Sequence, residues 1–196
     1  LRALLEEGYT VRDLPCDGAS LISRLLKGPT NERKKSQKVN LYLPIADYKD
    51  YFSTLPKSIQ DKVLERWGVP EADPFFNGDH LESPMFSIPA FQCGNIAIGL
   101  QPARGYNINP EKSYHDPDLV PPHGYLAFYA WLRVKFQADA IVHMGKHGNL
   151  EWLPGKSVAL SENCFPEVAL GPVPNIYPFI VNDPGEGTQA KRRTSA

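Results

Sequence analysis

The sequence has little cysteine and almost no net charge, and each shortage excludes a class of protein. Its three cysteines, Cys16, Cys93 and Cys164, stand far apart and form no C-x-x-C pair. That spacing fits neither a zinc knuckle nor a disulfide scaffold, so we expect a reducing, cytoplasmic setting. The formal net charge of −1 lacks the basic excess of a dedicated nucleic-acid binder, so we expect no nucleic-acid partner.

Long hydrophobic runs and processing signals are also missing. No apolar run approaches the roughly 20 residues of a membrane helix, so the sequence predicts no membrane span. Residues 1–7 become acidic after one turn and have no small-residue cleavage site, which argues against a signal peptide. Because a starting methionine is missing too, we expect the chain to be an excised segment of a larger protein.

Proline, by contrast, is abundant, and its placement argues against disorder. The 19 prolines avoid the window between Pro122 and Pro154, while 42% of all residues are hydrophobic and can fill a core. A disordered chain needs low hydrophobicity and high net charge. We therefore interpret the prolines as residues that stiffen loops by fixing the backbone φ angle.

The order of predicted elements indicates an α/β fold. Short apolar strands over 95–101 and 139–143 flank a strong amphipathic helix over 123–137, which predicts a right-handed βαβ crossover and a parallel strand pair. A further strand is expected over 177–181. We predict a partly parallel sheet with flanking helices and with long proline-rich loops at the carboxyl ends of its strands.

Three stretches are expected along the chain, with one compact domain as the alternative. Residues 1–37 are typical of the tail of an α/β unit, residues 38–90 of a strand plus a helical connector, and residues 91–196 of the α/β core. In the first stretch we expect a helix over 1–7, an extended piece at 9–11, a helix from Asp17 or Ser20 to Leu26 and a basic loop around Arg33–Lys35. In the second stretch we expect a strand over 39–45, a helical pattern over 46–67 that is broken at Pro56, and an irregular connector over 68–89.

Three polar loops follow the strands of the core segment, at 101–105, 143–151 and 182–188. Ligands of open α/β sheets bind beyond the carboxyl ends of the strands. We therefore expect the three loops to converge on one ligand crevice.

The middle loop carries the most chemistry. His143, His147 and Glu151 recur every four residues, and two imidazoles with one carboxylate suit a transition metal ion. Gly145 and Gly148 argue against a continuous helix, so a loop would have to bring the three side chains together. The alternative is that His143 ends a strand, His147 lies on a surface turn and Glu151 caps the next turn.

Residues 153–157 resemble the end of a nucleotide-binding P-loop but do not complete one. That motif needs a glycine where the chain has Leu150, and Pro154 removes a backbone donor. We expect any ATP chemistry to be supplied by another chain.

The remaining candidates suit anions or cap helices. Arg104 follows a strand and is a candidate anion contact. The loop 183–188 ends at a helix N-terminus, which favours a carboxylate or phosphate, although a glycine turn capped by Thr188 is an equal alternative. His115 and His123 flank the Pro121-Pro122 turn, where a histidine is more often a cap than a ligand.

Four blocks of this sequence are long and distinctive: Gln101–Tyr106, Pro122–Tyr125, Ala138–Lys156 and Val181–Arg193. They resemble the large subunit of cobaltochelatase, the CobN family, strongly from about residue 90 onward and more loosely upstream. The related large subunit of magnesium chelatase carries diverged versions of them, and the sequences Gln101-Pro-Ala-Arg-Gly105 and Glu151-Trp-Leu-Pro154 favour the cobalt branch.

The resemblance implies a multisubunit, ATP-dependent chelatase, a ligase that forms nitrogen–metal bonds. Its large subunit binds the tetrapyrrole and the metal, Co²⁺ enters as substrate, and AAA+ ATPase and adaptor partners hydrolyse ATP. The implied tetrapyrrole is hydrogenobyrinic acid a,c-diamide, a corrinoid precursor in cobalamin biosynthesis, and the segment alone is expected to be inactive. The alternatives are a magnesium chelatase acting on protoporphyrin IX, a stand-alone hydrolytic metalloenzyme and a non-catalytic scaffold segment.

Under this resemblance the candidate residues take roles. Insertion needs a metal on exchangeable ligands and a base for the pyrrolic protons, which favours His143, His147 and Glu151. Glu151 is the preferred base and His147 the preferred metal contact. The candidates for contact with the tetrapyrrole and its carboxylates are Arg104, His115, His123, Lys146, Asp183, Glu186 and Thr188.

Overall fold

A computed structural model of the chain describes residues 2–32, 39–78, 83–105, 118–145, 149–155, 161–178 and 188. Its helices are α1 (Arg2–Glu6), α2 (Gly18–Leu26), α3 (Ile45–Ser53), α4 (Lys57–Trp67), α6 (His123–Ala130) and α7 (Phe165–Leu170). Its strands are β1 (Tyr42–Pro44), β2 (Phe76–Asn77), β3 (Met85–Ser87), β4 (Ala90–Cys93), β5 (Ile96–Gly99), β6 (Ile141–Val142) and β7 (Asn175–Ile176). Shorter turns are a π-helical turn at Trp131–Lys135 and 3₁₀ turns at Pro70–Ala72 and Leu150–Trp152. The predicted basic loop Arg33–Lys35 lies outside the described residues.

The upstream helices follow their sequence signals. The Asp17 carboxylate accepts the backbone N–H of Ser20 at 2.8 Å, and the Ser20 hydroxyl accepts the N–H of Asp17 at 3.0 Å. This reciprocal capping box starts α2 where the sequence predicted it. Pro56 separates α3 from α4, also as predicted, because proline has no N–H to continue a helix. Residues 9–11, predicted as extended, form no strand.

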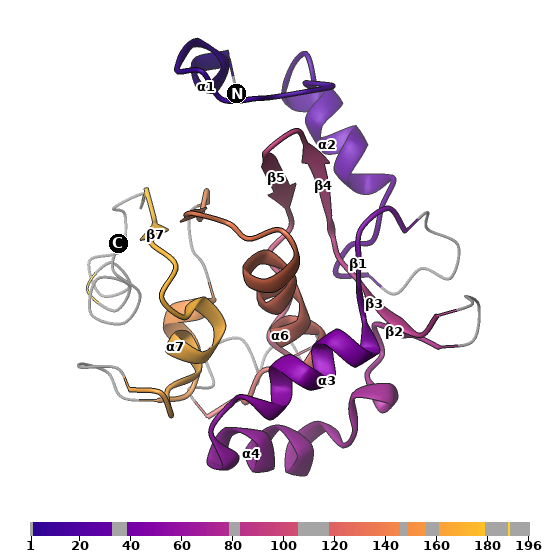
Figure 1. Ribbon diagram of the computed structural model, residues 1–196, viewed down its shortest axis with the longest axis vertical. Helices are drawn as coiled ribbons and strands as arrows, with labels where there is room; N and C mark the ends of the chain where they lie inside the picture. The colour runs from indigo at the N-terminus through magenta and orange to yellow at the C-terminus, as the bar shows by residue number, and fades with distance from the viewer. Residues whose placement is uncertain are drawn as a thin grey trace.

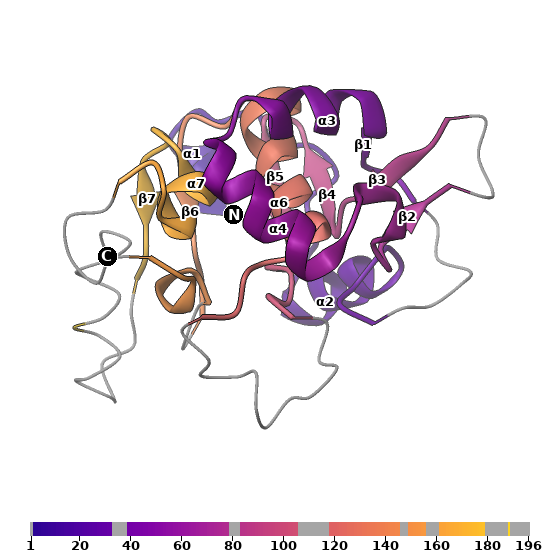
Figure 2. The same ribbon diagram turned by 90° about the horizontal axis from the view of Figure 1, so that it is seen from below.

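Helix α6 lies at the centre of the fold (Figure 1), and all of its residues except Gly124 are buried. Helices α3 and α7 pack against it. Figure 2 shows α6 between the sheet of β1 to β3 and the pair of β6 and β7. The helix itself was predicted, but the prediction of an amphipathic helix is wrong. A central helix has no solvent face and is therefore apolar nearly all round.

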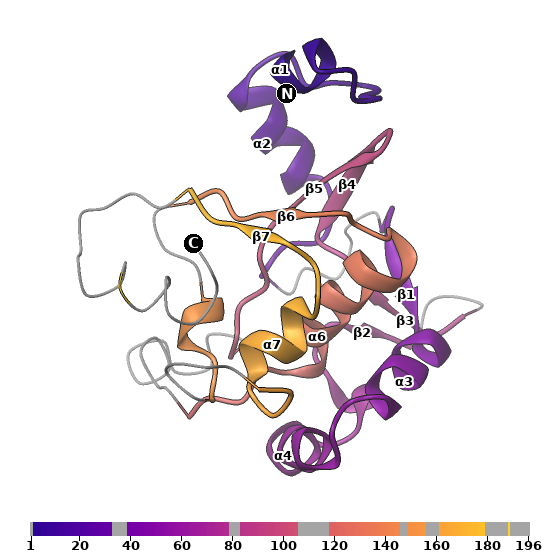
Figure 3. The same ribbon diagram turned by 60° about the vertical axis from the view of Figure 1, so that its left-hand side comes forward.

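The strands form three small sheets. Strands β1 and β2 both pair antiparallel with β3, and β4 pairs antiparallel with β5. Because β2 and β3 lie within residues 68–89, the prediction of an irregular connector there is wrong. Pairing of β3 with the distant β1 orders that segment, a contact that local sequence patterns do not reveal. Strands β6 and β7 are parallel and run side by side (Figure 3).

The predicted parallel pairing of 95–101 with 139–143 is wrong. Strand β5 instead folds back on β4 through Gly94, whose φ of +68° suits a tight hairpin turn. The parallel partner of β6 is β7, and the connection between them carries α7. The α/β class therefore holds, but the parallel pair is β6 and β7 and the helix that connects them is α7, not the helix over 123–137. β7 begins at residue 175, two residues before the predicted strand, whose residues 179–181 lie outside the described part.

The end of α7 is attached to α3 and to the π-helical turn by two side chains. The Val168 carbonyl accepts hydrogen bonds from the Tyr51 hydroxyl at 3.1 Å and from Arg133 Nη1 at 3.0 Å. The last carbonyls of a helix have no partner within the helix, so these donors satisfy one of them. Gly171, with a φ of +58°, leaves room for the guanidinium, since an added Cβ would overlap it.

We expect Gly171→Ala to lower the free energy of unfolding by about 3 kcal/mol, because it combines a left-handed backbone with overlap of Arg133. Gly68→Ala is the matched control: Gly68 also has a positive φ, but the nearest atom to its added Cβ is 4.0 Å away. The control should cost about 1 kcal/mol. Urea denaturation measures both losses, and equal losses would contradict the role given to Arg133.

Candidate functional site

Two of the three predicted loops lie side by side. The Asn149 side-chain amide donates to the Pro102 carbonyl at 2.9 Å, and its backbone N–H donates to Gln101 Oε1 at 3.3 Å. Arg104 Nη1 donates to the Trp152 carbonyl at 2.6 Å. The loop at 101–105 thus contacts the end of the loop at 143–151. The third loop, 182–188, lies outside the described residues apart from Thr188, which is exposed.

Two buried tyrosines of α6 form hydrogen bonds with side chains of both loops. The Tyr125 hydroxyl donates to Asn149 Oδ1 at 2.7 Å. The Tyr129 hydroxyl lies 3.0 Å from Gln101 Nε2 and 3.1 Å from His143 Nε2. On the far side of the imidazole, His143 Nδ1 lies 2.7 Å from the side-chain oxygen of Asn175 on β7. We call this set the tyrosine network: Gln101, Tyr125, Tyr129, His143, Asn149 and Asn175.

No functional role was predicted from the sequence for either tyrosine of this network. The available signal was their spacing: two tyrosines four residues apart lie on one face of a helix. A buried tyrosine hydroxyl needs a hydrogen-bond partner, so this pair predicts polar groups facing that side of α6.

Burial governs the electrostatics of the two hydroxyls. Desolvation raises the pKa of Tyr129 to about 12 and holds the pKa of Tyr125 well above its ordinary value. The negative charge of Glu151 raises both pKa values further, while the Arg104 guanidinium opposes the rise at Tyr125. Both phenols therefore stay protonated at neutral pH and act as hydrogen-bond donors.

Glu151 and Arg104 are the charged residues whose electrostatic effect reaches the tyrosines of this network. Glu151 lies on the 3₁₀ turn Leu150–Trp152 with only 1% of its surface exposed, and Arg104 is also buried. Buried charged groups are rare unless partners inside the fold stabilise them. Glu151, the predicted base, and Arg104, a predicted anion contact, thus both lie inside the fold.

His143 is partly exposed, as are Gln101, Asn149 and Asn175 in the same network. Burial lowers the pKa of its imidazole, and the hydrogen bond to Asn175 opposes that change. The ring is therefore mainly neutral at pH 7, the form that binds metal ions. Among the described residues, no group of three or more His, Cys, Asp or Glu side chains is arranged to hold a metal. Five predicted site residues lie outside the described part: His115, Lys146, His147, Asp183 and Glu186.

His123 belongs to a different polar cluster, beneath the start of α6. Its Nδ1 lies 2.7 Å from the Tyr48 hydroxyl and its Nε2 lies 2.9 Å from the Gly68 carbonyl, and the residue is fully buried. Nearby, Asp73 accepts the backbone N–H of Gly124 at 2.9 Å. These contacts tie the helix to α3 and to the end of α4. Both ring nitrogens of His123 are thus hydrogen-bonded inside the fold. A role of His123 in substrate binding stays a prediction.

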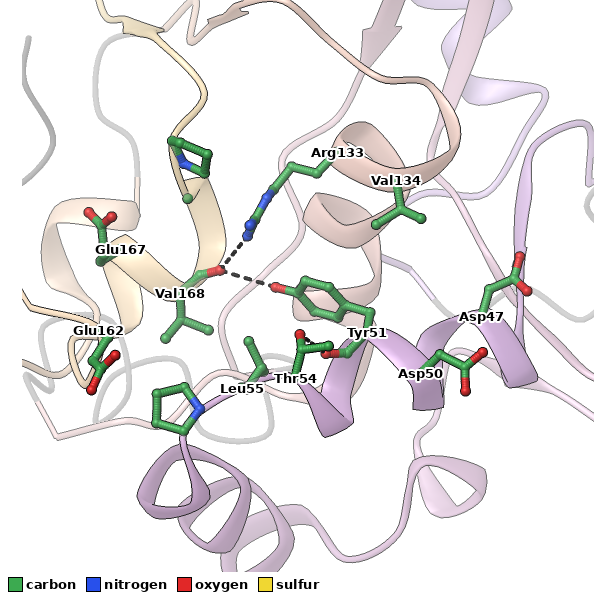
Figure 4. Close-up of a pocket in the computed structure, with 13 residues that line it drawn as sticks. Asp47, Asp50, Tyr51, Thr54, Leu55, Arg133, Val134, Glu162, Glu167 and Val168 are labelled. Atoms are coloured by element: carbon green, nitrogen blue, oxygen red, sulfur yellow. Dashed lines mark hydrogen bonds between the residues drawn. The ribbon is translucent and has the colours of Figure 1, made fainter.

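A groove of about 670 Å³ lies between α3, the π-helical turn and α7 (Figure 4). Its lining includes Tyr51 and Arg133, which share the Val168 carbonyl, and the acidic residues Asp50 and Glu167. None of the predicted site residues lines this groove.

In the described ranges, no helix is long and apolar enough to span a membrane.

The chain matches a family model along its whole length. Residues 1–196 match the family described as CobN/Magnesium Chelatase. The sequence is 61% identical over 196 residues to the aerobic cobaltochelatase subunit CobN of Sinorhizobium sp, covering all of this chain and 15% of that protein. It is 35% identical over 199 residues to the chloroplastic magnesium-chelatase subunit ChlH of Oryza sativa subsp. indica, covering 14% of it.

A solved structure agrees with these sequence relationships. The catalytic subunit of cobaltochelatase from Mycobacterium tuberculosis superimposes with a TM-score of 0.84 at 46% identity, and the match covers the whole chain and 17% of that subunit. The fold and the motifs are therefore those of metal-chelatase large subunits. The chain belongs to the CobN/magnesium chelatase family, and it spans about one sixth of the length of the relatives it matches.

Burial lowers the pKa of His123, so the unfolded chain binds a proton there more readily than the folded chain does. Its contribution to stability is present above about pH 6.5 and is lost as the pH falls below that value. We expect wild-type stability to fall as the pH drops below 6.5, and His123 adds up to about 1.4 kcal/mol per pH unit to that loss. His123→Leu should be less stable at pH 7 but should have a shallower slope, measured by urea denaturation at several pH values. An unchanged slope would contradict this account.

Proposed function

We propose that the chain is the part of a cobaltochelatase large subunit that handles the metal and the inner N–H proton of the macrocycle during metal insertion. The observation that carries this proposal is the 61% identity, over the entire chain, to an aerobic cobaltochelatase subunit. The tyrosine network supports it, because a neutral imidazole is hydrogen-bonded to the protonated Tyr129 phenol, on which the charge of the buried Glu151 also acts.

The proposed reaction inserts Co²⁺ into hydrogenobyrinic acid a,c-diamide in the cytoplasm and releases the inner N–H proton of that corrin macrocycle. AAA+ ATPase and adaptor subunits are the proposed partners that hydrolyse ATP. The sequence of residues 153–157 fits that division of labour, since it lacks the first glycine of a P-loop.

In this proposal His143 offers its Nε2 to the metal and His147 is the second imidazole. Metal insertion requires ligands that release their ion, and two neutral imidazoles bind divalent ions more weakly than a full set of thiolates. Glu151 takes the inner N–H proton. Its charge acts on the Tyr125 and Tyr129 hydroxyls, and the Tyr129 hydroxyl is hydrogen-bonded to His143.

The substrate contacts in this proposal are charged and polar groups of the loops at 101–105, 143–151 and 182–188. Arg104 and Lys146 are the proposed cationic contacts for the carboxylate side chains of the macrocycle, and Asp183, Glu186 and Thr188 are the proposed further polar contacts. Charge-assisted hydrogen bonds from guanidinium to carboxylate are among the strongest that a site can offer.

A magnesium chelatase is the second candidate, and the 35% identity to a ChlH subunit is the observation that favours it. The two candidates differ in metal and in macrocycle. Assays of the full-length large subunit with its partners, offering Co²⁺ with the corrinoid precursor and Mg²⁺ with protoporphyrin IX, separate them. Insertion of magnesium alone would replace the cobalt assignment.

Glu151→Gln in the full-length large subunit should reduce the rate of metal insertion about 100-fold or more, since general acid–base catalysis contributes 10²–10⁴-fold. Binding of the tetrapyrrole, followed by fluorescence quenching, should change less than about threefold. Glu162→Gln is the matched control, because Glu162 is an exposed carboxylate that lines the groove of Figure 4 and lies outside the tyrosine network.

The control should insert metal at the wild-type rate. Insertion by Glu151→Gln at the wild-type rate would remove the base role, and a scaffold function would then explain the segment. Loss of tetrapyrrole binding in parallel with insertion would assign Glu151 to binding.

A further inference from the structure

The hydrogen bonds around Tyr129 run in one consistent direction. Gln101 Oε1 accepts the backbone N–H of Asn149, so the amide nitrogen of Gln101 is the group that donates to the Tyr129 oxygen. Because that oxygen already accepts a hydrogen, the tyrosine's own proton is available for His143 Nε2, 3.1 Å away.

This direction determines the tautomer of His143. A donor aimed at Nε2 requires a lone pair there, so the single ring proton lies on Nδ1. Nδ1 then donates to the side-chain oxygen of Asn175 at 2.7 Å. The opposite tautomer would place two acceptors, Nδ1 and the Asn175 oxygen, at that short distance.

We infer that Asn175 and Tyr129 are positioning residues for His143: Asn175 holds the Nδ1–H tautomer, and the Tyr129 hydroxyl occupies Nε2 until a divalent metal ion displaces it. The inference rests on the proposed function, in which His143 contacts the metal. Histidines that ligate metals commonly donate their other ring N–H to an oxygen, and the contact with Asn175 has that form.

Displacement of the hydroxyl leaves Tyr129 with partners. Gln101 continues to donate to its oxygen, and Tyr125, whose side chain already interacts with it, lies next to it on the helix. Metal binding at Nε2 therefore breaks the hydrogen bond between the Tyr129 hydroxyl and His143, and this bond forms again when the metal leaves. The hydroxyl weakens metal binding at His143 and favours release, which a metal on its way into a macrocycle requires.

The test is calorimetric titration of Co²⁺ into the full-length large subunit. Tyr129→Phe should bind Co²⁺ about 3- to 10-fold more tightly, the equivalent of losing one competing hydrogen bond. Tyr48→Phe is the matched control, because Tyr48 is also fully buried and its hydroxyl also bonds a histidine, at His123 Nδ1. The control should stay within about twofold of wild type.

Asn175 provides the second variant and keeps the inference testable if loss of the Tyr129 hydroxyl unfolds the protein. Asn175→Leu should weaken Co²⁺ binding about 10-fold or more, as expected when the partner of a ligating imidazole is lost. Asn175→Asp keeps an oxygen for the Nδ1 proton and should restore the affinity. A merely structural role would not be rescued in this way.

A further variant separates failure of this inference from failure of the proposed function. If His143→Ala leaves Co²⁺ binding unchanged, the metal role of His143 in the proposed function is wrong, and the inference falls with it. If His143→Ala weakens binding while Tyr129→Phe binds no more tightly than Tyr48→Phe, the role of Tyr129 is overturned and the proposed function stands. Equal weakening by Asn175→Leu and Asn175→Asp would overturn the role of Asn175.

Discussion

Burial of α6 on all sides is the constraint on which the rest of this structure depends. A helix without a solvent face must satisfy every polar side chain inside the fold, because an unbonded buried hydroxyl costs roughly 1–3 kcal/mol. The hydroxyls of Tyr125 and Tyr129 meet that requirement through Gln101, Asn149 and His143. The same bonds that stabilise the helix therefore draw the two loops together, and they place the imidazole at the edge of the network.

The two ends of α6 solve the same problem differently. At its start, His123 and its neighbours form a closed cluster in which both ring nitrogens bond other parts of the chain. Toward its end, Tyr129 reaches His143, which is only partly buried. The first arrangement suits stability alone. The second suits chemistry, since a partly exposed imidazole with a neutral ring can exchange one of its hydrogen bonds for another ligand.

Glu151 gives this second cluster its charge. A buried carboxylate beside two phenols and a guanidinium is an arrangement that proteins use where a proton or a cation must be handled. The charge of Glu151 acts on both the Tyr125 and the Tyr129 hydroxyl, which are the groups that join the two loops to α6.

Local signals in the sequence were sufficient for much of the fold. The helix start at Asp17, the break at Pro56 and the helix that begins at His123 all depend on neighbouring residues, and the structure confirms them. The loops at 101–105 and 143–151 do lie together, but the parallel strand pairing from which their approach was expected is wrong. The four family blocks were sufficient to identify the family, because long runs of residues are far more specific than short motifs.

Only the tertiary structure decided the strand partners and the chemistry inside the site. The apolar run of β5 is equally compatible with a parallel partner and with the local hairpin that it forms with β4. The parallel partner of β6 is β7, where paired residues lie 34 positions apart in the chain. The role of Tyr129 likewise depends on Gln101, 28 positions before it, and on His143, 14 positions after it. Hydrogen bonds between distant residues leave no periodic trace in the sequence, so a tyrosine that holds a site together has the same pattern as one that fills a core.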